Sequence, residues 1–110
     1  MRVAIAQLNT TVGALAENEA KILTAYRRGV EANADIVVTP ELGITGYPPR
    51  DLLLKESFVE ANQAALRRIA EQTQEIGLVV GFVESSSKAT GRPLYNSAAL
   101  LHRGQITAIR

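Results

Sequence analysis

The chain has 110 residues, of which 46% are hydrophobic and 21% charged, and its formal net charge is +1. This composition is typical of a globular domain with one hydrophobic core. The sequence has no basic stripe and no apolar run of about twenty residues, so we expect neither nucleic acid nor a membrane as a partner. It contains no cysteine and one histidine, which argues against disulfides, a metal site and a cysteine nucleophile within these residues.

The first half of the chain predicts a strand, a helix and a second strand. Residues 2–8 form an apolar run that predicts a buried strand with Val3, Ile5 and Leu8 on one face. Residues 14–33 carry apolar side chains at helical spacing, with charged residues between them. Residues 36–39 are apolar or β-branched and precede a proline, which predicts a short strand that ends there. This order predicts two parallel strands joined by a crossover helix.

The second half begins with a short helical turn at residues 51–54 and an amphipathic helix at residues 57–74. Residues 78–83 are continuously apolar, which predicts a third strand that is covered on both faces. Gly81 within this strand indicates a bulge or the close approach of another backbone segment. The first three predicted strands therefore belong to one parallel sheet.

The last quarter of the chain predicts a β-hairpin. Residues 85–92 are small and polar and predict a surface connector, in which Lys88 is a weak candidate for function. Residues 94–102 and 105–110 predict two antiparallel strands around a two-residue turn. The expected fold is α/β, with a mixed sheet, two crossover helices and a C-terminal hairpin. The last strand has no capping element after it, so we expect residues 1–110 to be a truncated domain.

Glu41 is the first candidate reactive residue because it directly follows the second predicted strand. Ligands of α/β proteins bind beyond the carboxyl ends of parallel strands, and the prolines of residues 40–50 restrict the loop that carries this carboxylate. A carboxylate desolvated against the strand end could act as a general base. The alternative is that Glu41 caps a helix or pairs with a surface arginine.

Two further residues are candidates for the same site. Tyr47 lies between a glycine and two prolines, and its hydroxyl could bind or orient a substrate, although packing is the commoner role of such a tyrosine. Asn96 places an amide in an otherwise apolar strand. Because a buried amide needs hydrogen-bond partners, we expect Asn96 to give structural support by tying this strand to the Glu41 loop. No glycine-rich phosphate-binding motif is present.

The segment IVVTPELGITGYPP resembles the first catalytic segment of the nitrilase or carbon-nitrogen hydrolase superfamily. The continuation RDLLLKESF, together with MRVAIAQLNTTVGALAEN and LYNSAALLHRGQI, is similar to the N-terminal glutaminase (amidotransferase) domain of glutamine-dependent NAD+ synthetases. The resemblance implies an α-β-β-α nitrilase-type sandwich, formed by a domain more than twice as long as this chain. It also implies that residues 1–110 are an N-terminal fragment and that the synthetase domain is absent.

The resemblance further implies a chemistry, in which a Glu-Lys-Cys triad hydrolyses the side-chain amide of glutamine. The ammonia serves the ATP-dependent amidation of deamido-NAD+ in the synthetase domain. Glu41 matches the catalytic general base and Tyr47 falls near the glutaminase site, whereas the lysine and cysteine are expected beyond Arg110. We therefore expect the fragment alone to be inactive. The partners expected are glutamine, the C-terminal synthetase domain of the parent and further copies in a homo-oligomer.

The resemblance implies no cofactor for the glutaminase chemistry, and ATP and Mg2+ for the absent synthetase domain alone. Because the N-terminus lacks the apolar core and cleavage site of a signal peptide, a cytoplasmic location is the default expectation. Two other functions remain open at this point. The parent could be a stand-alone nitrilase-superfamily amidase or carbamoyl hydrolase. A chain complete at 110 residues could instead be a non-enzymatic α/β interaction module.

Overall fold

The computed structural model describes residues 1–85 and 94–110, so most of the predicted connector, including Lys88, lies outside the described residues. The elements in chain order are β1 (Val3–Ile5), α1 (Leu15–Glu31), β2 (Ile36–Val38), a 3-10 helix (Arg50–Leu54), α2 (Glu56–Glu71), β3 (Gly77–Ser85), β4 (Leu94–His102) and β5 (Gln105–Ile109). Neither helix in these ranges combines the length and the apolar character that crossing a membrane would require.

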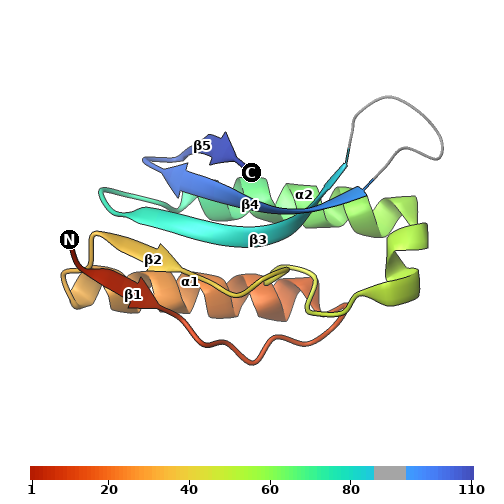
Figure 1. Ribbon diagram of the computed structural model, residues 1–110, viewed down its shortest axis with the longest axis horizontal. Helices are drawn as coiled ribbons and strands as arrows, with labels where there is room; N and C mark the ends of the chain where they lie inside the picture. Colours follow the sequence, from red (N-terminus) through yellow and green to blue (C-terminus); the bar gives the residue numbers. More distant parts are fainter. Residues whose placement is uncertain (86–93) are drawn as a thin grey trace.

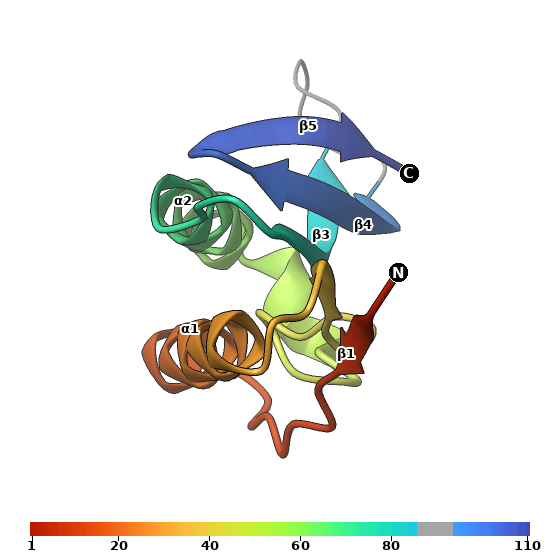
Figure 2. The ribbon, with the colours of Figure 1, turned by 90° about the vertical axis from the view of Figure 1, so that its left-hand side faces the viewer.

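The strands form one five-stranded sheet in the order β1-β2-β3-β4-β5. The first three strands are parallel, and β4 and β5 are antiparallel to their neighbours. Both helices lie on the same face of this sheet, so that the described part has two layers (Figures 1 and 2). The predicted α/β fold with a mixed sheet, two crossover helices and a C-terminal hairpin is therefore confirmed.

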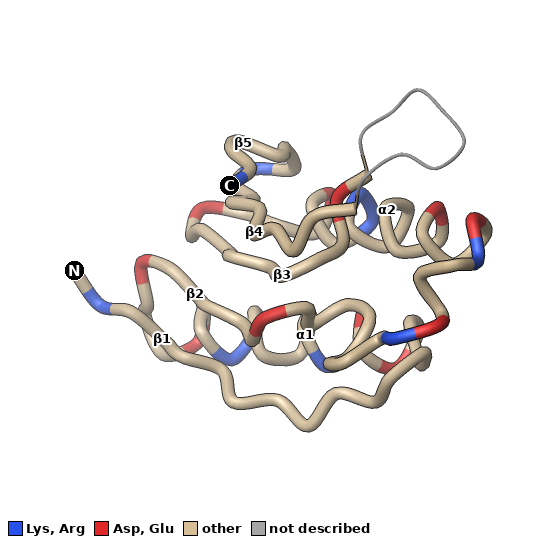
Figure 3. Tube along the Cα trace, turned by 45° about the vertical axis from the view of Figure 1, so that its right-hand side comes forward, with Lys and Arg blue, Asp and Glu red and all other residues tan. Residues whose placement is uncertain are grey.

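The hydrophobic core lies between the two helices and the inner face of the sheet. It is formed by fully or almost fully buried side chains of both layers, among them Ile22, Tyr26, Val37, Leu66, Ile69, Leu78, Val80, Phe82 and Leu101. Acidic and basic residues lie mainly on the helices and the connecting segments, whereas the strands carry almost none (Figure 3). This separation explains why the strands read as nearly continuous apolar runs in the sequence.

The predicted burial of the first strand was wrong for Val3 and Ile5. Val3 and Ile5 are 48% and 75% exposed, whereas Ala4 and Ala6 pack against the core. Side chains of a strand alternate between the two faces of its sheet, and here apolar residues occupy both alternating sets. The period of two therefore could not indicate which set faces the helices.

The first strand is also shorter than the predicted residues 2–8. Its last hydrogen bond to the neighbouring strand joins the Ala6 N–H to the Val38 carbonyl oxygen, at 2.8 Å. Since β2 ends at Val38, the chain beyond Ala6 has no strand beside it on that side. It leaves the sheet and runs toward the N-terminus of α1 (Figure 1).

Candidate active site

The loop that carries Glu41 is bonded to β3 at both of its ends. At the first end, the N–H and the hydroxyl of Thr39 both donate to the Val79 carbonyl oxygen, at 3.0 and 2.8 Å. At the second end, the Ile44 N–H donates to the Gly81 carbonyl oxygen at 3.3 Å. The loop therefore leaves the sheet at the end of β2 and is hydrogen-bonded to β3 both before and after the residues that protrude.

The protruding residues, 40–43, form a tight turn with Glu41 at its second position. The Gly43 N–H donates to the Pro40 carbonyl oxygen at 3.1 Å, and Leu42 has a positive φ of 48°. The turn lies directly on Gly81, where an added Cβ would be 2.5 Å from the Leu42 nitrogen and 2.7 Å from the Pro40 oxygen. This is the close backbone approach that the glycine predicts, and it leaves no room for any other residue without movement of the turn.

The structure brings two of the sequence-predicted residues together. Asn96 lies opposite Val83 in the antiparallel β3–β4 pair, and its Nδ2 donates a hydrogen bond to the Glu41 Oε1. Both residues are exposed, so the predicted desolvation of Glu41 and the predicted burial of Asn96 were wrong. Within the described residues, the position of the carboxylate is set by its turn and by the Asn96 amide.

A pocket of about 350 Å³ lies at this point of the sheet. It is lined by Val38, Thr39, Pro40, Glu41, Val79, Gly81, Asn96, Ser97, Ala98 and Arg110. An acidic residue, Glu41, and a basic residue, Arg110, therefore border an otherwise mainly apolar hollow. Tyr47 is not among the lining residues, and its side chain is 64% exposed.

Sequence reasoning missed one residue that contacts the Glu41 loop. Asn18, on α1, is fully buried and its Nδ2 donates to the Ile44 carbonyl oxygen at 2.9 Å. The sequence does contain a signal, since Asn18 lies at helical spacing between Leu15 and Ile22. An amide on the apolar stripe of a helix must find buried hydrogen-bond partners, and these partners prove to belong to the loop.

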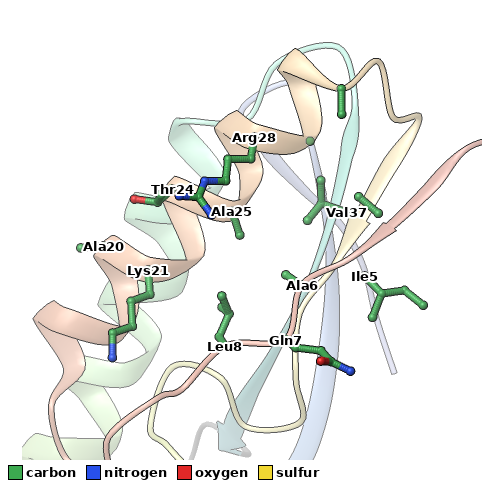
Figure 4. A pocket seen from close by; sticks show the side chains of 13 residues that line it. Ile5, Ala6, Gln7, Leu8, Ala20, Lys21, Thr24, Ala25, Arg28 and Val37 are labelled. Atoms are coloured by element: carbon green, nitrogen blue, oxygen red, sulfur yellow. The ribbon is translucent and has the colours of Figure 1, made fainter.

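A second and larger cavity, of about 630 Å³, lies between β1 and α1. Figure 4 shows Lys21, Thr24 and Arg28 of the helix on one side of it, and Ala6 and Leu8 on the other. This cavity contains neither Glu41 nor Asn96. The smaller pocket is therefore the candidate active site, because it contains Glu41, the candidate general base, beside the Asn96 amide that bonds to it.

A mixed α/β sheet with a carboxylate on a fixed turn beyond a parallel strand is an arrangement suited to acid–base chemistry. The family profile described as carbon-nitrogen hydrolase matches residues 2–110. The chain therefore belongs to the carbon-nitrogen hydrolase family.

The relatives by sequence include several glutamine-dependent NAD(+) synthetases. The chain is 45% identical over 108 residues to that of Synechocystis sp., a match that covers 94% of the chain and 19% of the relative. It is 38% identical over 111 residues to that of Thermotoga maritima, covering 99% of the chain and 18% of the relative. The chain thus spans about a fifth of the length of the curated relatives that it matches.

Solved structures agree with this relationship. A glutamine-dependent NAD(+) synthetase from Cytophaga hutchinsonii is similar with a TM-score of 0.89 and 28% identity, over 99% of this chain and 18% of that one. An amidase from Nesterenkonia sp. is similar with a TM-score of 0.77 and 27% identity, over 99% of this chain and 41% of that one. The two-layer fold described above therefore also occurs as part of a longer chain in both kinds of relative.

Proposed function

We propose that this chain is the N-terminal part of the glutaminase domain of a glutamine-dependent NAD+ synthetase. The observation that carries the proposal is the turn that holds Glu41 beyond the end of β2, where Asn96 donates to its carboxylate. The relatives named above, which match along nearly all of the chain, support glutamine as the amide that is cleaved.

In this proposal Glu41 is the general base. A cysteine sulfur attacks the side-chain carbonyl carbon of glutamine while Glu41 accepts the thiol proton and then gives it to the departing ammonia. Breaking of the C–N bond leaves a glutamyl thioester. A water molecule then loses a proton to Glu41 and attacks the thioester, so that the C–S bond breaks, glutamate leaves and the proton passes from Glu41 to the cysteine sulfur. The chain contains no cysteine, so in this proposal the nucleophile comes from residues beyond Arg110. The family resemblance places the triad lysine there as well, and the isolated fragment is inactive.

Two residues assist Glu41 in this proposal. The Asn96 amide holds the carboxylate in one orientation. This orientation matters for the rate, because a general base must point its oxygen at the proton that it accepts. Tyr47, which follows the same loop and is largely exposed, contacts the substrate. Its contact requires that residues beyond this chain extend the pocket toward it.

The proposal extends to the whole protein. Ammonia from the glutaminase domain reaches a C-terminal synthetase domain, which amidates deamido-NAD+ with ATP and Mg2+ in a cytoplasmic homo-oligomer. The names of the relatives support glutamine-dependent NAD+ synthesis, and the chain covers 18–19% of the two sequences described. ATP, Mg2+, the location and the oligomer are proposed from the family resemblance and from the lack of a signal peptide.

A second candidate function is that of a stand-alone amidase, and the similarity to the Nesterenkonia amidase favours it. A glutamate variant of that enzyme carries the acetamide moiety of fluoroacetamide on its active-site cysteine. The same fold segment therefore also occurs in an enzyme that is not named a synthetase. A non-enzymatic interaction module is disfavoured, because the chain belongs to a family of hydrolases.

The test uses the full-length protein that begins with this chain, as wild type and as Glu41→Gln. We expect the wild type to hydrolyse glutamine and to make NAD+ from deamido-NAD+, ATP and Mg2+ with either glutamine or ammonium. We expect Glu41→Gln to lose glutamine-dependent synthesis and to keep ammonium-dependent synthesis. A wild type that cleaves other amides but not glutamine would establish the amidase instead.

A further inference from the structure

We propose that Asn18 is a positioning residue for Glu41, acting from α1 through the backbone of Ile44. The inference rests on the proposed role of Glu41 as general base. It concerns a residue that lies outside the candidate pocket and touches none of the reacting groups. Asn18 would therefore influence the reaction only by fixing where the Glu41 turn stands.

The Asn18 amide is fully buried and uses all of its hydrogen-bonding groups. Its Oδ1 accepts from the Thr11 N–H at 2.9 Å, while its Nδ2 donates to the Thr11 carbonyl oxygen at 2.8 Å and to the Ile44 carbonyl oxygen at 2.9 Å. One side chain thus joins the segment that precedes α1 to the loop that follows β2. A buried amide with three such bonds has a single orientation, since any other leaves polar groups unpaired.

Two further contacts join the same segments. The Gly13 N–H donates to the Thr45 carbonyl oxygen at 2.9 Å. Gly46 has a φ of 78°, and an added Cβ there would lie 2.7 Å from the Cα and the nitrogen of Val12. The backbones of residues 11–13 and 44–46 are therefore packed against each other, with the Asn18 amide inside the junction.

The junction reaches Glu41 through Ile44. The Ile44 carbonyl oxygen is held by Asn18 on one side, and the Ile44 N–H is held by the Gly81 carbonyl oxygen of β3 on the other. Ile44 follows directly after the four-residue turn that carries Glu41, so a displacement of Ile44 displaces the turn. A misplacement of about 1 Å in a reacting group can cost about 100-fold in rate. Loss of the hydrogen bond from Asn18 to the Ile44 carbonyl oxygen should therefore slow a reaction in which Glu41 is the base.

Another buried polar side chain provides a matched control. The Thr73 hydroxyl donates to the Ala70 carbonyl oxygen at 2.6 Å and accepts from the Gly104 N–H at 3.0 Å. Like Asn18, Thr73 joins a helix to a connecting segment, here the turn between β4 and β5. It does not line the pocket that contains Glu41. Its removal should lower stability without moving the Glu41 turn.

The experiment compares Asn18→Ala and Thr73→Ala in the full-length protein, with kcat and KM for glutamine, ammonium-dependent synthesis and the melting temperature as readouts. We expect Asn18→Ala to lower kcat for glutamine by about 10–100-fold while KM and ammonium-dependent synthesis change by less than about threefold. We expect Thr73→Ala to lower the melting temperature with little change in kcat. Should Asn18→Ala not fold, Asn18→Ser gives the same test, because its neutral hydroxyl can still bond to the Thr11 backbone but is too short to replace the Nδ2 donor to the Ile44 carbonyl oxygen.

A double variant separates positioning from general destabilisation. Without the base there is nothing left to position, so adding Asn18→Ala to Glu41→Gln should not lower the residual single-turnover rate further. Equal losses of kcat in Asn18→Ala and Thr73→Ala, or an additive loss in the double variant, would overturn the inference. Normal kcat in Asn18→Ala beside a strong loss in Glu41→Gln would overturn it and leave the proposed function standing. A wild type without glutamine turnover would instead overturn the proposed function itself.

Discussion

Asn96 and Glu41 are 55 positions apart in the chain and are joined by a hydrogen bond from the amide of one to the carboxylate of the other. The bond links the antiparallel half of the sheet, which contains β4, to the loop at the end of the parallel half. Because both residues are exposed, the bond competes with water and its energy is modest. Its importance lies in the direction that it gives to the carboxylate.

Replacing Asn96 should therefore affect rate more than stability. In the full-length protein we expect Asn96→Ala to lower kcat for glutamine by roughly tenfold, because the carboxylate is left to sample other orientations. We expect Asn96→Asp to lower it further, because it places a like charge beside Glu41. Steady-state glutamine hydrolysis measures both effects, and Gln105→Ala, an exposed amide on β5, serves as the control. Unchanged kcat in Asn96→Asp would show that the bond has no part in the reaction.

The contact between Gly81 and the Glu41 turn predicts that a substitution of Gly81 lowers both stability and activity. Gly81→Ala places a Cβ at 2.5 Å from the Leu42 nitrogen, a backbone atom that cannot move without the turn. We expect a loss of about 1–3 kcal/mol in the free energy of unfolding together with a strong loss of glutamine hydrolysis. Gly77→Ala on the same strand is the control, since its nearest neighbour is the Ile36 side chain at 3.3 Å. Chemical denaturation and glutaminase assays of both variants measure the two effects. Equal losses of stability and activity in Gly81→Ala and Gly77→Ala would refute the prediction.

Tyr47→Phe tests the predicted substrate contact. The side chain is 64% exposed in the described structure, so loss of its hydroxyl should leave stability unchanged. If the hydroxyl binds glutamine, we expect KM for glutamine to rise by roughly threefold to tenfold, as for loss of one hydrogen bond of about 1 kcal/mol. The effect should be smaller than that of Glu41→Gln. An unaltered KM would remove Tyr47 from the substrate site.

Tyr26 offers a prediction about stability alone. Its hydroxyl donates to the Ile76 carbonyl oxygen at 2.7 Å and accepts from the Gln74 N–H at 2.8 Å, and the residue is 3% exposed. Tyr26→Phe leaves both backbone groups without this partner, so we expect a loss of about 1–3 kcal/mol in the free energy of unfolding. Urea denaturation measures the change, and Tyr95→Phe, at a side chain that is 50% exposed, should be neutral. Glutamine turnover at low temperature should be unaffected in both.

The elements of the fold could be predicted because each has a strong local signal. β4 begins and ends where its apolar run does, from Leu94 to His102, and both helices lie within two to three residues of their predicted bounds. The facing of β1 could not be predicted, since it depends on which side the helices cover. That is a property of the whole sheet, and no three-residue strand encodes it.

In the candidate site, too, some residues could be predicted from local sequence signals and others could not. Glu41 and Gly81 could be selected from the sequence because a strand end and a glycine inside a strand have few explanations. The bond between Asn96 and Glu41 depends on the β3–β4 register, which local patterns do not specify. Asn18 was missed for a related reason, because its partners lie in two separate loops and become neighbours only when the sheet has formed.

The strand order β1-β2-β3-β4-β5 has a consequence for how this part of the protein is made. Each strand of the described sheet pairs with the strand that precedes it in the sequence. No later strand is inserted between two earlier ones. The ribosome delivers the strands in this same order, so the sheet can grow during synthesis by contacts between chain neighbours, which form fastest. The turn that carries Glu41 can therefore be in place on Gly81 before any residue after β5 has emerged.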